Sequence, residues 1–291
     1  MIPRFSLTRA RQLDEAFEAF AAAGGEAAYL AGGTELLQVM KMGLAQFGTL
    51  VDVKRLPELR GLSLDDGRIR IGAATTHREL ERSALLAEQL PAFCGLARRV
   101  ANVRVRSQGT LGGNLCFAEP HSDPATLLLV CDGRLELAGP AGRREVGAAD
   151  FVLGPLSTDR AAEEILLSVT LAPRAAGAGV AYEKIAFFER PAVSLAVRLE
   201  VGQGGDGRIG RAVVAVGSIG ERPTLLPQAA QALTGADRGQ LPDAIAAARE
   251  RLAEVEAVPD LNGSPDYKRH LAGVLLGRAA TQAYEEAVSR A

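Results

Sequence analysis

Two pairs of consecutive glycines mark the parts of this chain that could bind a ligand through the main chain. The first pair, Gly32 and Gly33, separates a short apolar run at residues 28–30 from a segment with helical spacing. Consecutive glycines let the backbone turn sharply and approach a ligand closely, and the free N–H groups of a helix start favour an anion such as a pyrophosphate. A tight strand-to-helix turn capped by Thr34 explains the same residues without a ligand.

The second pair, Gly112 and Gly113, lies between Thr110 and Asn114 in an otherwise apolar segment. Hydroxyl, amide and main-chain donors of this kind can line a phosphate or a ribityl chain, and a β-bulge would use the same residues. Farther along, Asp123 precedes a proline at the expected start of a helix. It is either the N-cap of that helix or a carboxylate that binds a ligand, in which case its loss would weaken binding and leave the fold intact.

A third glycine-rich segment, residues 202–207, satisfies the GxGxxG pattern but has the wrong context for a dinucleotide site. It leads into another strand-like run at residues 209–216, so no helix start follows that could hold a pyrophosphate. Gly and Asp are typical of β-turns, and we therefore interpret the segment as a hairpin loop.

His121, Ser122 and Asp123 are adjacent in the chain, an arrangement that rarely forms a catalytic triad.

Composition excludes several other classes of function. The chain has 33 basic and 35 acidic residues, a formal charge of -2, so it lacks the basic surplus that binds nucleic acid. No apolar run approaches the roughly 18 residues of a membrane span and the N-terminus resembles no signal peptide, so we expect no integral membrane segment and a cytoplasmic protein. Three cysteines and three histidines lack metal-binding spacing, which predicts reduced structural cysteines and no metal site.

The elements at the start of the chain, which must position the first glycine pair, alternate between helix and strand. Leu13, Phe17 and Phe20 have helical spacing, and glycines at 24 and 25 end that helix. Strands are expected at residues 28–30 and 50–53, with a helix at 35–42 between them. This order is typical of a βαβ unit and favours parallel pairing.

A mixed α+β unit is expected to begin near Leu56. Thr76 and Glu79 form a capping box for helices over most of residues 78–101, and a glycine-rich loop is expected at 109–114. Strands are expected at 68–72, 134–138 and 164–171, and a helix at 123–130.

The small, proline-broken segment at residues 172–179 is the predicted linker to a third unit. Three strands, at 180–188, 193–201 and 209–218, should form an antiparallel meander. Helices should follow at 225–233, 244–255 and 266–288, and Ser264 with Pro265 should begin the last one.

The two glycine segments, AGGTELLQVMKMG at residues 31–43 and TLGGNL at 110–115, resemble the flavin-binding loops of the FAD domain in the molybdenum hydroxylase family. That family includes xanthine dehydrogenase and aerobic carbon monoxide dehydrogenase, whose medium subunit carries the FAD. The similarity continues in order through SDP at 122–124, EEILLSVTL at 163–171, YEKIA at 182–186 and DYKRHLAGVLLGRA in the last helix. On the basis of these six blocks, which occur in the right order along almost the whole chain, the chain is identified as a member of this family.

The resemblance implies an α+β fold of the FAD-binding PCMH type, which is vanillyl-alcohol-oxidase-like. It has an N-terminal α/β FAD-binding subdomain (1–55), a middle α+β FAD-binding subdomain (56–173) and a C-terminal domain (178–289) with a three-stranded antiparallel sheet and helices. The resemblance also implies a first loop that wraps the FAD pyrophosphate, made of Tyr29, Leu30, Ala31, Gly32, Gly33, Thr34, Glu35 and Leu36.

The remaining site residues are also carried over from the family by the resemblance. Asp123 would accept hydrogen bonds from ribityl or adenosine hydroxyls, and Lys184 would contact the flavin. Leu166 would pack near the adenine, where Val100 replaces an aromatic residue of some relatives. The second phosphate-side loop would contain Thr110, Leu111, Gly112, Gly113 and Asn114. No residue of this chain is expected to act as an acid–base catalyst or a metal ligand.

The implied function is that of an electron-transfer subunit. Electrons from substrate oxidation at molybdopterin would pass through two [2Fe–2S] clusters to the FAD of this chain and then to an external acceptor. The partners would be a small iron–sulfur subunit and a large molybdopterin subunit, assembled as a dimer of heterotrimers. One alternative is a stand-alone flavin-dependent oxidoreductase, which would oxidise a donor by itself. The other is a non-catalytic assembly protein that has lost FAD. A yellow purified protein would exclude this second alternative.

Overall fold

The computed structural model describes residues 2–187, 189–202 and 207–291. Its first sheet has three strands in the order β1-β3-β2, and β3 pairs in parallel with both neighbours, as the βαβ order predicts. Strand β1 was not expected, because all four of its residues are exposed and show no apolar alternation. The elements of this part are β1 (Ser6–Arg9), α1 (Leu13–Ala22), β2 (Ala27–Leu30), α2 (Leu36–Lys41) and β3 (Thr49–Asp52).

The second sheet has five strands in the order β4-β5-β10-β6-β7, and all of its pairs are antiparallel. The central strand β10 is buried at nearly every residue, and η1 and α7 pack against it. The edge strands β4 and β7 are largely exposed, so the sequence pattern did not reveal them. The strands are β4 (Leu62–Asp65), β5 (Arg68–Gly72), β6 (Arg134–Gly139), β7 (Gly142–Gly147) and β10 (Ile165–Leu171).

Short helices surround this sheet. The capping box at Thr76 and Glu79 is present, and Ser83 and Pro91 start new helices, so the helical stretch expected over 78–101 is divided into three. The remaining short elements include a two-stranded hairpin of β8 and β9. The elements are η1 (Pro57–Leu59), α3 (His77–Arg82), α4 (Ala84–Gln89), α5 (Pro91–Arg98), α6 (Val103–Arg106), α7 (Leu111–Phe117), α8 (Pro124–Val130), α9 (Ala148–Phe151), β8 (Val152–Gly154) and β9 (Ser157–Thr158).

The glycine-rich loop expected at residues 109–114 is in fact the start of helix α7, which corrects the sequence prediction. The hydroxyl of Thr110 accepts a hydrogen bond from the Gly113 amide and caps the helix. Because this cap and two bonds to neighbouring carbonyls satisfy the first amides, the glycines adopt a helical conformation despite their low helix propensity.

The third large sheet has the order β11-β12-β13-β14. The three expected strands form the antiparallel meander, and a two-residue fourth strand extends it, so the sheet is four-stranded rather than three-stranded. Ser264 caps the last helix, as predicted, by accepting a hydrogen bond from the Tyr267 amide. The elements are β11 (Ala178–Ile185), β12 (Val193–Val201), β13 (Ile209–Gly217), β14 (Thr224–Leu225), α10 (Pro227–Leu233), α11 (Leu241–Glu250), η2 (Arg251–Glu254) and α12 (Pro265–Val288).

Two sequence predictions at the borders of this sheet need comment. The predicted linker at 172–179 ends too late, because Gly179 lies within β11, directly under α12, where a Cβ would collide with the main-chain oxygen of Ala283. Only a glycine lets the helix and the strand approach so closely. Of the GxGxxG segment, residues 203–206 lie outside the described residues, while the strands on either side of it pair antiparallel.

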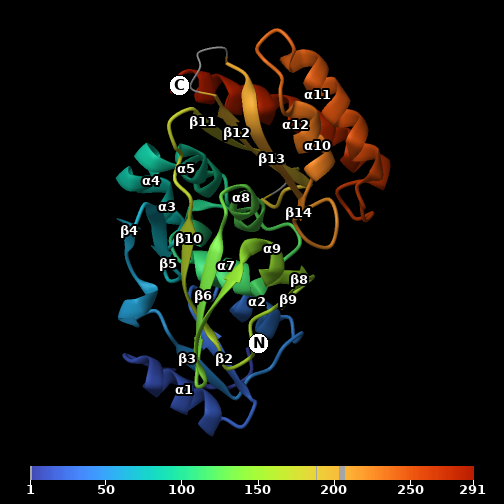
Figure 1. Cartoon of the computed structure of the whole chain (residues 1–291). Coiled ribbons are helices and arrows are strands. Elements are labelled where there is room, and N and C mark those ends of the chain that lie inside the picture. The colour runs from blue at the N-terminus through green and yellow to red at the C-terminus, as the bar shows by residue number, and fades with distance from the viewer. Residues whose placement is uncertain (1, 188, 203–206) are drawn as a thin grey trace.

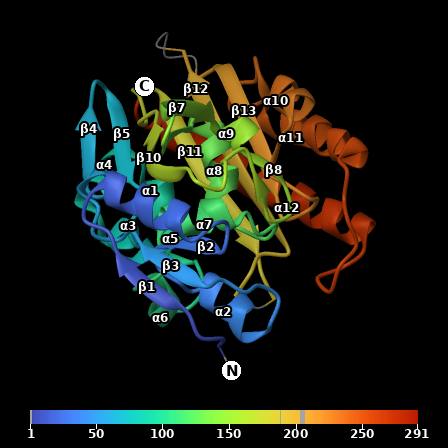
Figure 2. The same ribbon diagram turned by 90° about the horizontal axis from the view of Figure 1, so that it is seen from below.

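Alternate residues of β12 face two different cores. Val193, Leu195 and Val197 pack with helix α12, whereas Ala196 belongs to the core of the middle part of the chain. Helices α5 and α8 cover this second face, so the sheet is buried on both sides. Figure 1 shows that the β1–β3 part lies at one end of the molecule and the β11–β14 sheet with α10–α12 at the other, with helices α5, α7 and α8 between them. In Figure 2, which is seen from below, the β1–β3 part is nearest the viewer. None of the described helices is long and apolar enough to cross a membrane.

Candidate cofactor site

The two glycine segments lie against each other in the structure. A Cβ on Gly32 would collide with the main-chain oxygen of Gln108, just before the second segment. A Cβ on Gly109 would lie 3.3 Å from the hydroxyl oxygen of Thr34, and one on Gly113 would lie 3.8 Å from the Cβ of Ala31. Because these glycines have no side chains, two stretches of main chain that are far apart in sequence lie in contact and form one wall of the candidate site.

The main-chain donors of the two segments differ in availability. Within the described part of the chain, the N–H groups of residues 31–36 donate to no protein acceptor. By contrast, the amides of Leu111 and Gly112 donate to Thr75 and Ala73 at 2.9 and 2.8 Å. Those of Gly113 and Asn114 donate to Thr110. Only the first segment therefore has main-chain donors that are available to a ligand, and the second can contribute close approach of its backbone.

The first loop is fixed on both sides. At its start, the hydroxyl of Tyr29 donates to the main-chain oxygen of Glu163 at 2.9 Å, and the Tyr29 ring stacks on Phe20 with centroids 4.7 Å apart. Within it, Gly33 has a φ of +73°, a conformation that favours glycine. Near its end, Glu35 occupies the N-cap position of α2 without a side-chain cap bond and accepts hydrogen bonds from Arg190 instead. Thr34 is therefore not the cap of this helix.

Asp123 and Lys184 form a buried ion pair with Tyr182. The Lys184 ammonium lies 2.8 Å from one Asp123 oxygen, and the Tyr182 hydroxyl donates to the same oxygen at 2.6 Å. Asp123 stands at the N-cap position of α8 but makes no side-chain cap bond, so the helix-cap interpretation of its carboxylate is wrong. Alternation along β11 turns both partners toward α8, which is why they reach Asp123.

Burial dominates the electrostatics of this group. It raises the pKa of Asp123, an effect that Lys184 and the hydrogen bond from Tyr182 oppose. Burial and the neighbouring carboxylate also raise the pKa of the Tyr182 hydroxyl well above its usual value. Lys184 donates in addition to the main-chain oxygen of Arg99 at 2.8 Å, next to Val100. The residue expected to contact the flavin is thus hydrogen-bonded to the chain neighbour of Val100, which is expected near the adenine.

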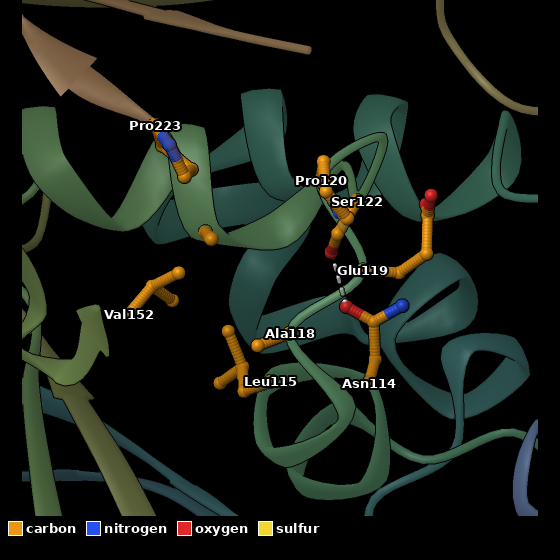
Figure 3. A pocket seen from close by; sticks show the side chains of 9 residues that line it. Asn114, Leu115, Ala118, Glu119, Pro120, Ser122, Val152 and Pro223 are labelled. Carbon is orange, nitrogen blue, oxygen red and sulfur yellow. Dashed lines mark hydrogen bonds between the residues drawn. The ribbon is translucent and has the colours of Figure 1, made fainter. Parts of the chain in front are cut away.

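A hydrogen bond between Ser122 and Asn114 links the second glycine segment to the residue beside Asp123. Ser122, beside Asp123, donates to the Asn114 side chain at 2.6 Å, and Figure 3 shows this bond beside a cavity of about 10 Å³, room for about one water molecule. Leu166 lies in the core on β10, opposite Leu137, and is only 3% exposed, so little of its side chain is free to touch a ligand. Among the described residues, no group of three or more His, Cys, Asp and Glu side chains is placed to hold a metal ion.

Several residues of this region were missed in the sequence. Gln108 supports the first loop through its main chain, so its side-chain type carried no signal. Tyr182 belongs to the YEKIA block, and its alternation with Lys184 along one strand would have placed both on one face. Arg190 and Glu119 form an ion pair at 3.2 Å whose members are 71 residues apart (190 minus 119), and nothing local in the sequence indicates it.

His121 connects the α7–α8 segment with the start of α12. Its Nδ1 lies 3.0 Å from Glu119 and its Nε2 lies 2.7 Å from Asp260, which also accepts from the buried Lys268. Hydrogen bonding to Glu119, reinforced by Asp260, raises the pKa of His121 despite its partial burial.

This raised pKa predicts a pH-dependent contribution to stability. The stabilisation by His121 should be complete below its unfolded pKa of about 6.5 and should be lost as pH rises through the higher folded value. We expect His121→Gln to lower the thermal unfolding midpoint most near about pH 5.5 and least near about pH 9. His270→Gln, at an exposed position of α12, is the control for the loss of a histidine side chain as such. A difference for His121→Gln that does not change with pH would contradict the assignment.

Comparison with known proteins places this geometry in a family. Residues 3–174 match the FAD binding domain in molybdopterin dehydrogenase, and residues 189–283 match the CO dehydrogenase flavoprotein C-terminal domain. The carbon monoxide dehydrogenase medium chain of Hydrogenophaga pseudoflava is 30% identical over 97% of this chain and 98% of its own length. The nicotine 6-hydroxylase medium subunit of Paenarthrobacter nicotinovorans is 31% identical over 87% of this chain and 88% of its own length.

Solved structures agree with the sequence relatives. A chain of carbon monoxide dehydrogenase from Hydrogenophaga pseudoflava, in a form lacking the Mo-pyranopterin moiety, matches 98% of this chain and 99% of its own, with a TM-score of 0.92 and 31% identity. Fold and site thus define a flavoprotein component of an oxidoreductase. The chain belongs to the molybdenum hydroxylase family, as an FAD-binding medium subunit.

Proposed function

We propose that this chain accepts electrons from the [2Fe–2S] clusters of a partner subunit and passes them to an external acceptor. When bound, FAD supplies the redox chemistry, because it can exchange one or two electrons. The protein residues then have three tasks: to bind the cofactor, to orient it and to limit the access of water. The observation that carries the proposal is the contact between the Gly32 main chain and Gln108, which joins the two glycine segments into one wall.

The residues present fit an FAD diphosphate. The N–H groups of residues 31–36 have no acceptor in the described protein, and unpaired main-chain donors in a concave turn are suited to an anion. Gly112 and Gly113 would let the α7 backbone approach the cofactor from the other side. Asp123 and Lys184 would orient the hydroxyl-bearing and flavin portions, and Val100 and Leu166 would supply apolar contact. These roles follow the family resemblance. The amides of residues 31–36 support the role of the first loop, whereas Leu166 is only 3% exposed and has little side-chain surface to offer a ligand.

The assembly is also part of the proposal. The relatives are named as medium chains or medium subunits, a term that implies a smaller and a larger partner. We therefore propose an iron–sulfur small subunit and a molybdopterin large subunit, arranged as a dimer of heterotrimers in the cytoplasm. Substrate oxidation would take place in the large subunit. Within the chain, we retain the division into an N-terminal and a middle FAD-binding subdomain of the PCMH type (1–55 and 56–173) and a C-terminal domain (178–289).

The proposal is tested with the purified full-length chain and its separately purified iron–sulfur partner. The chain should contain about one FAD per molecule, and its flavin absorbance should bleach when the pre-reduced partner is added without oxygen. A partner whose clusters have been removed is the matched control and should leave the flavin oxidised. A chain without flavin, or a flavin that the reduced partner does not bleach, would overturn the proposal. Oxidation of a small-molecule donor by the chain alone would instead indicate a stand-alone oxidoreductase.

A further inference from the structure

The connection between β11 and β12 is bound to both sides of the candidate FAD site. One guanidinium nitrogen of Arg190 donates to both oxygens of Glu35, at 3.0 and 3.1 Å, near the end of the first glycine loop. The other lies 3.2 Å from Glu119, in the segment that follows α7. Beside Arg190, the carboxylate of Glu189 accepts from the Asn102 side chain at 2.8 Å. A single connection of the C-terminal sheet thus contacts three parts of the FAD-binding region.

Arginine is suited to this position for geometric reasons. Its planar guanidinium offers several donors in a fixed arrangement, so two carboxylates can bind to different nitrogens at once. The Arg190 side chain is 51% exposed, whereas those of Glu35 and Glu119 are 34% and 17% exposed. Each pair alone would contribute little at such exposure, but the two share one cation and form a network. Water and salt reach the arginine, so the network should weaken at high ionic strength.

The two carboxylates differ in how firmly they are held. Glu119 also binds His121, which in turn binds Asp260, so it is anchored on the side away from Arg190. Apart from Arg190, the structure gives no partner for the Glu35 carboxylate among the described residues. When Arg190 is lost, Glu119 should therefore keep its place, and the segment that gains freedom should be the first glycine loop.

We propose that Arg190 is a positioning residue that holds the first glycine loop against its neighbours and thereby slows the release of FAD. This inference rests on the proposed function for the presence of FAD, and it adds a determinant of cofactor retention. The arginine acts through Glu35, because the unpaired amides of residues 31–36 lie directly before and after that carboxylate. Loss of the cation should loosen these donors together.

The test measures FAD release from the full-length chain after dilution, by the recovery of FAD fluorescence, at low and high salt. Release from Arg190→Gln should be about five- to tenfold faster than from the wild type at low salt, and the difference should shrink at high salt. Arg190→Lys, which keeps the charge but not the planar fork, should restore part of the retention. A role in packing alone would give neither the salt dependence nor the rescue by lysine.

The matched control is Arg143→Gln on the edge strand β7, where a similarly exposed arginine pairs with Glu136 at 3.0 Å. It should release FAD at the wild-type rate. Hydrogen exchange of the FAD-free chain provides a second readout, in which the amides of Leu37, Gln38 and Val39, which donate to the main-chain oxygens of Gly33 and Glu35, should exchange faster in Arg190→Gln than in the wild type. A wild-type chain that binds no FAD would overturn the proposed function, whereas unchanged release or unchanged exchange in Arg190→Gln would overturn this inference alone.

Discussion

Asp123→Ala is expected to destabilise the folded chain by about 3–5 kcal/mol, because it leaves a cation without its partner in the interior. The side chains of Lys184 and Asp123 are only 6% and 5% exposed, so water cannot replace the lost carboxylate. The Tyr182 hydroxyl, which donates to Asp123 at 2.6 Å, would also lose its acceptor. An unsatisfied buried donor adds its own desolvation cost. FAD binding should fall with the stability of the site.

A double-mutant cycle measures this coupling. Asp123→Ala, Lys184→Met and the double variant are compared by the midpoint and free energy of unfolding. The double variant should be more stable than Asp123→Ala, since a buried ion pair can be replaced by apolar groups more easily than it can be broken. Arg143→Ala, in an exposed pair, is the control and should cost no more than about 1 kcal/mol. Additive losses for Asp123 and Lys184 would show that the pair is not coupled.

This expectation differs from the one that the sequence supports. In the sequence, Asp123 precedes a proline and a helix, which predicts either a cap or a ligand, and both interpretations leave the fold intact when the residue is removed. The structure shows that its partners lie 59 and 61 residues farther along the chain, on strand β11. Pairing over such a separation depends on tertiary packing, which local patterns do not encode.

Periodicity predicted the elements whose two faces differ or whose residues are all apolar. Strand β12 was predicted with its observed bounds, 193–201, because its residues are buried on both faces between distinct turn segments. Strands β1 and β7 were missed, since edge strands with exposed side chains carry no apolar alternation. The helical start of α7 was missed for a different reason: glycines disfavour helix, and the carbonyls of Thr75 and Ala73 that stabilise it come from another segment.

Part of the candidate site can likewise be predicted from the sequence, and part of it cannot. The glycine pairs are visible in the sequence because no other residue type supports such main-chain turns. Their mutual contact is not visible, and neither is the ion pair that joins Glu35 to Arg190 across 155 residues. Family resemblance supplied the convergence of the loops as an expectation, and the position of Gly32 against Gln108 gives it a physical basis. Under the proposed function, FAD binding would depend on this close approach of the main chain as well as on particular side chains.

Gly32 is the position where this dependence is strongest. A Cβ added there would collide with the main-chain oxygen of Gln108 and would also come within 2.8 Å of the Cα of Gly109. Both obstacles are backbone atoms, so no side-chain rotation can relieve the overlap. The Gln108 carbonyl cannot shift freely either, because the neighbouring Gly109 amide donates to Val105 at 2.7 Å and the Gly109 carbonyl accepts from His77 at 3.0 Å.

Gly32→Ala should therefore separate the two glycine segments, destabilise the chain by about 1–3 kcal/mol and abolish most FAD binding. The measurements are the flavin content of the purified variant and its thermal unfolding midpoint. Gly95→Ala in helix α5 is the matched control, because a Cβ there meets no atom within 4 Å and alanine in a helix should stabilise by up to about 1 kcal/mol. If Gly32→Ala kept a full complement of FAD and the wild-type midpoint, close approach of these two segments would not be what holds the cofactor.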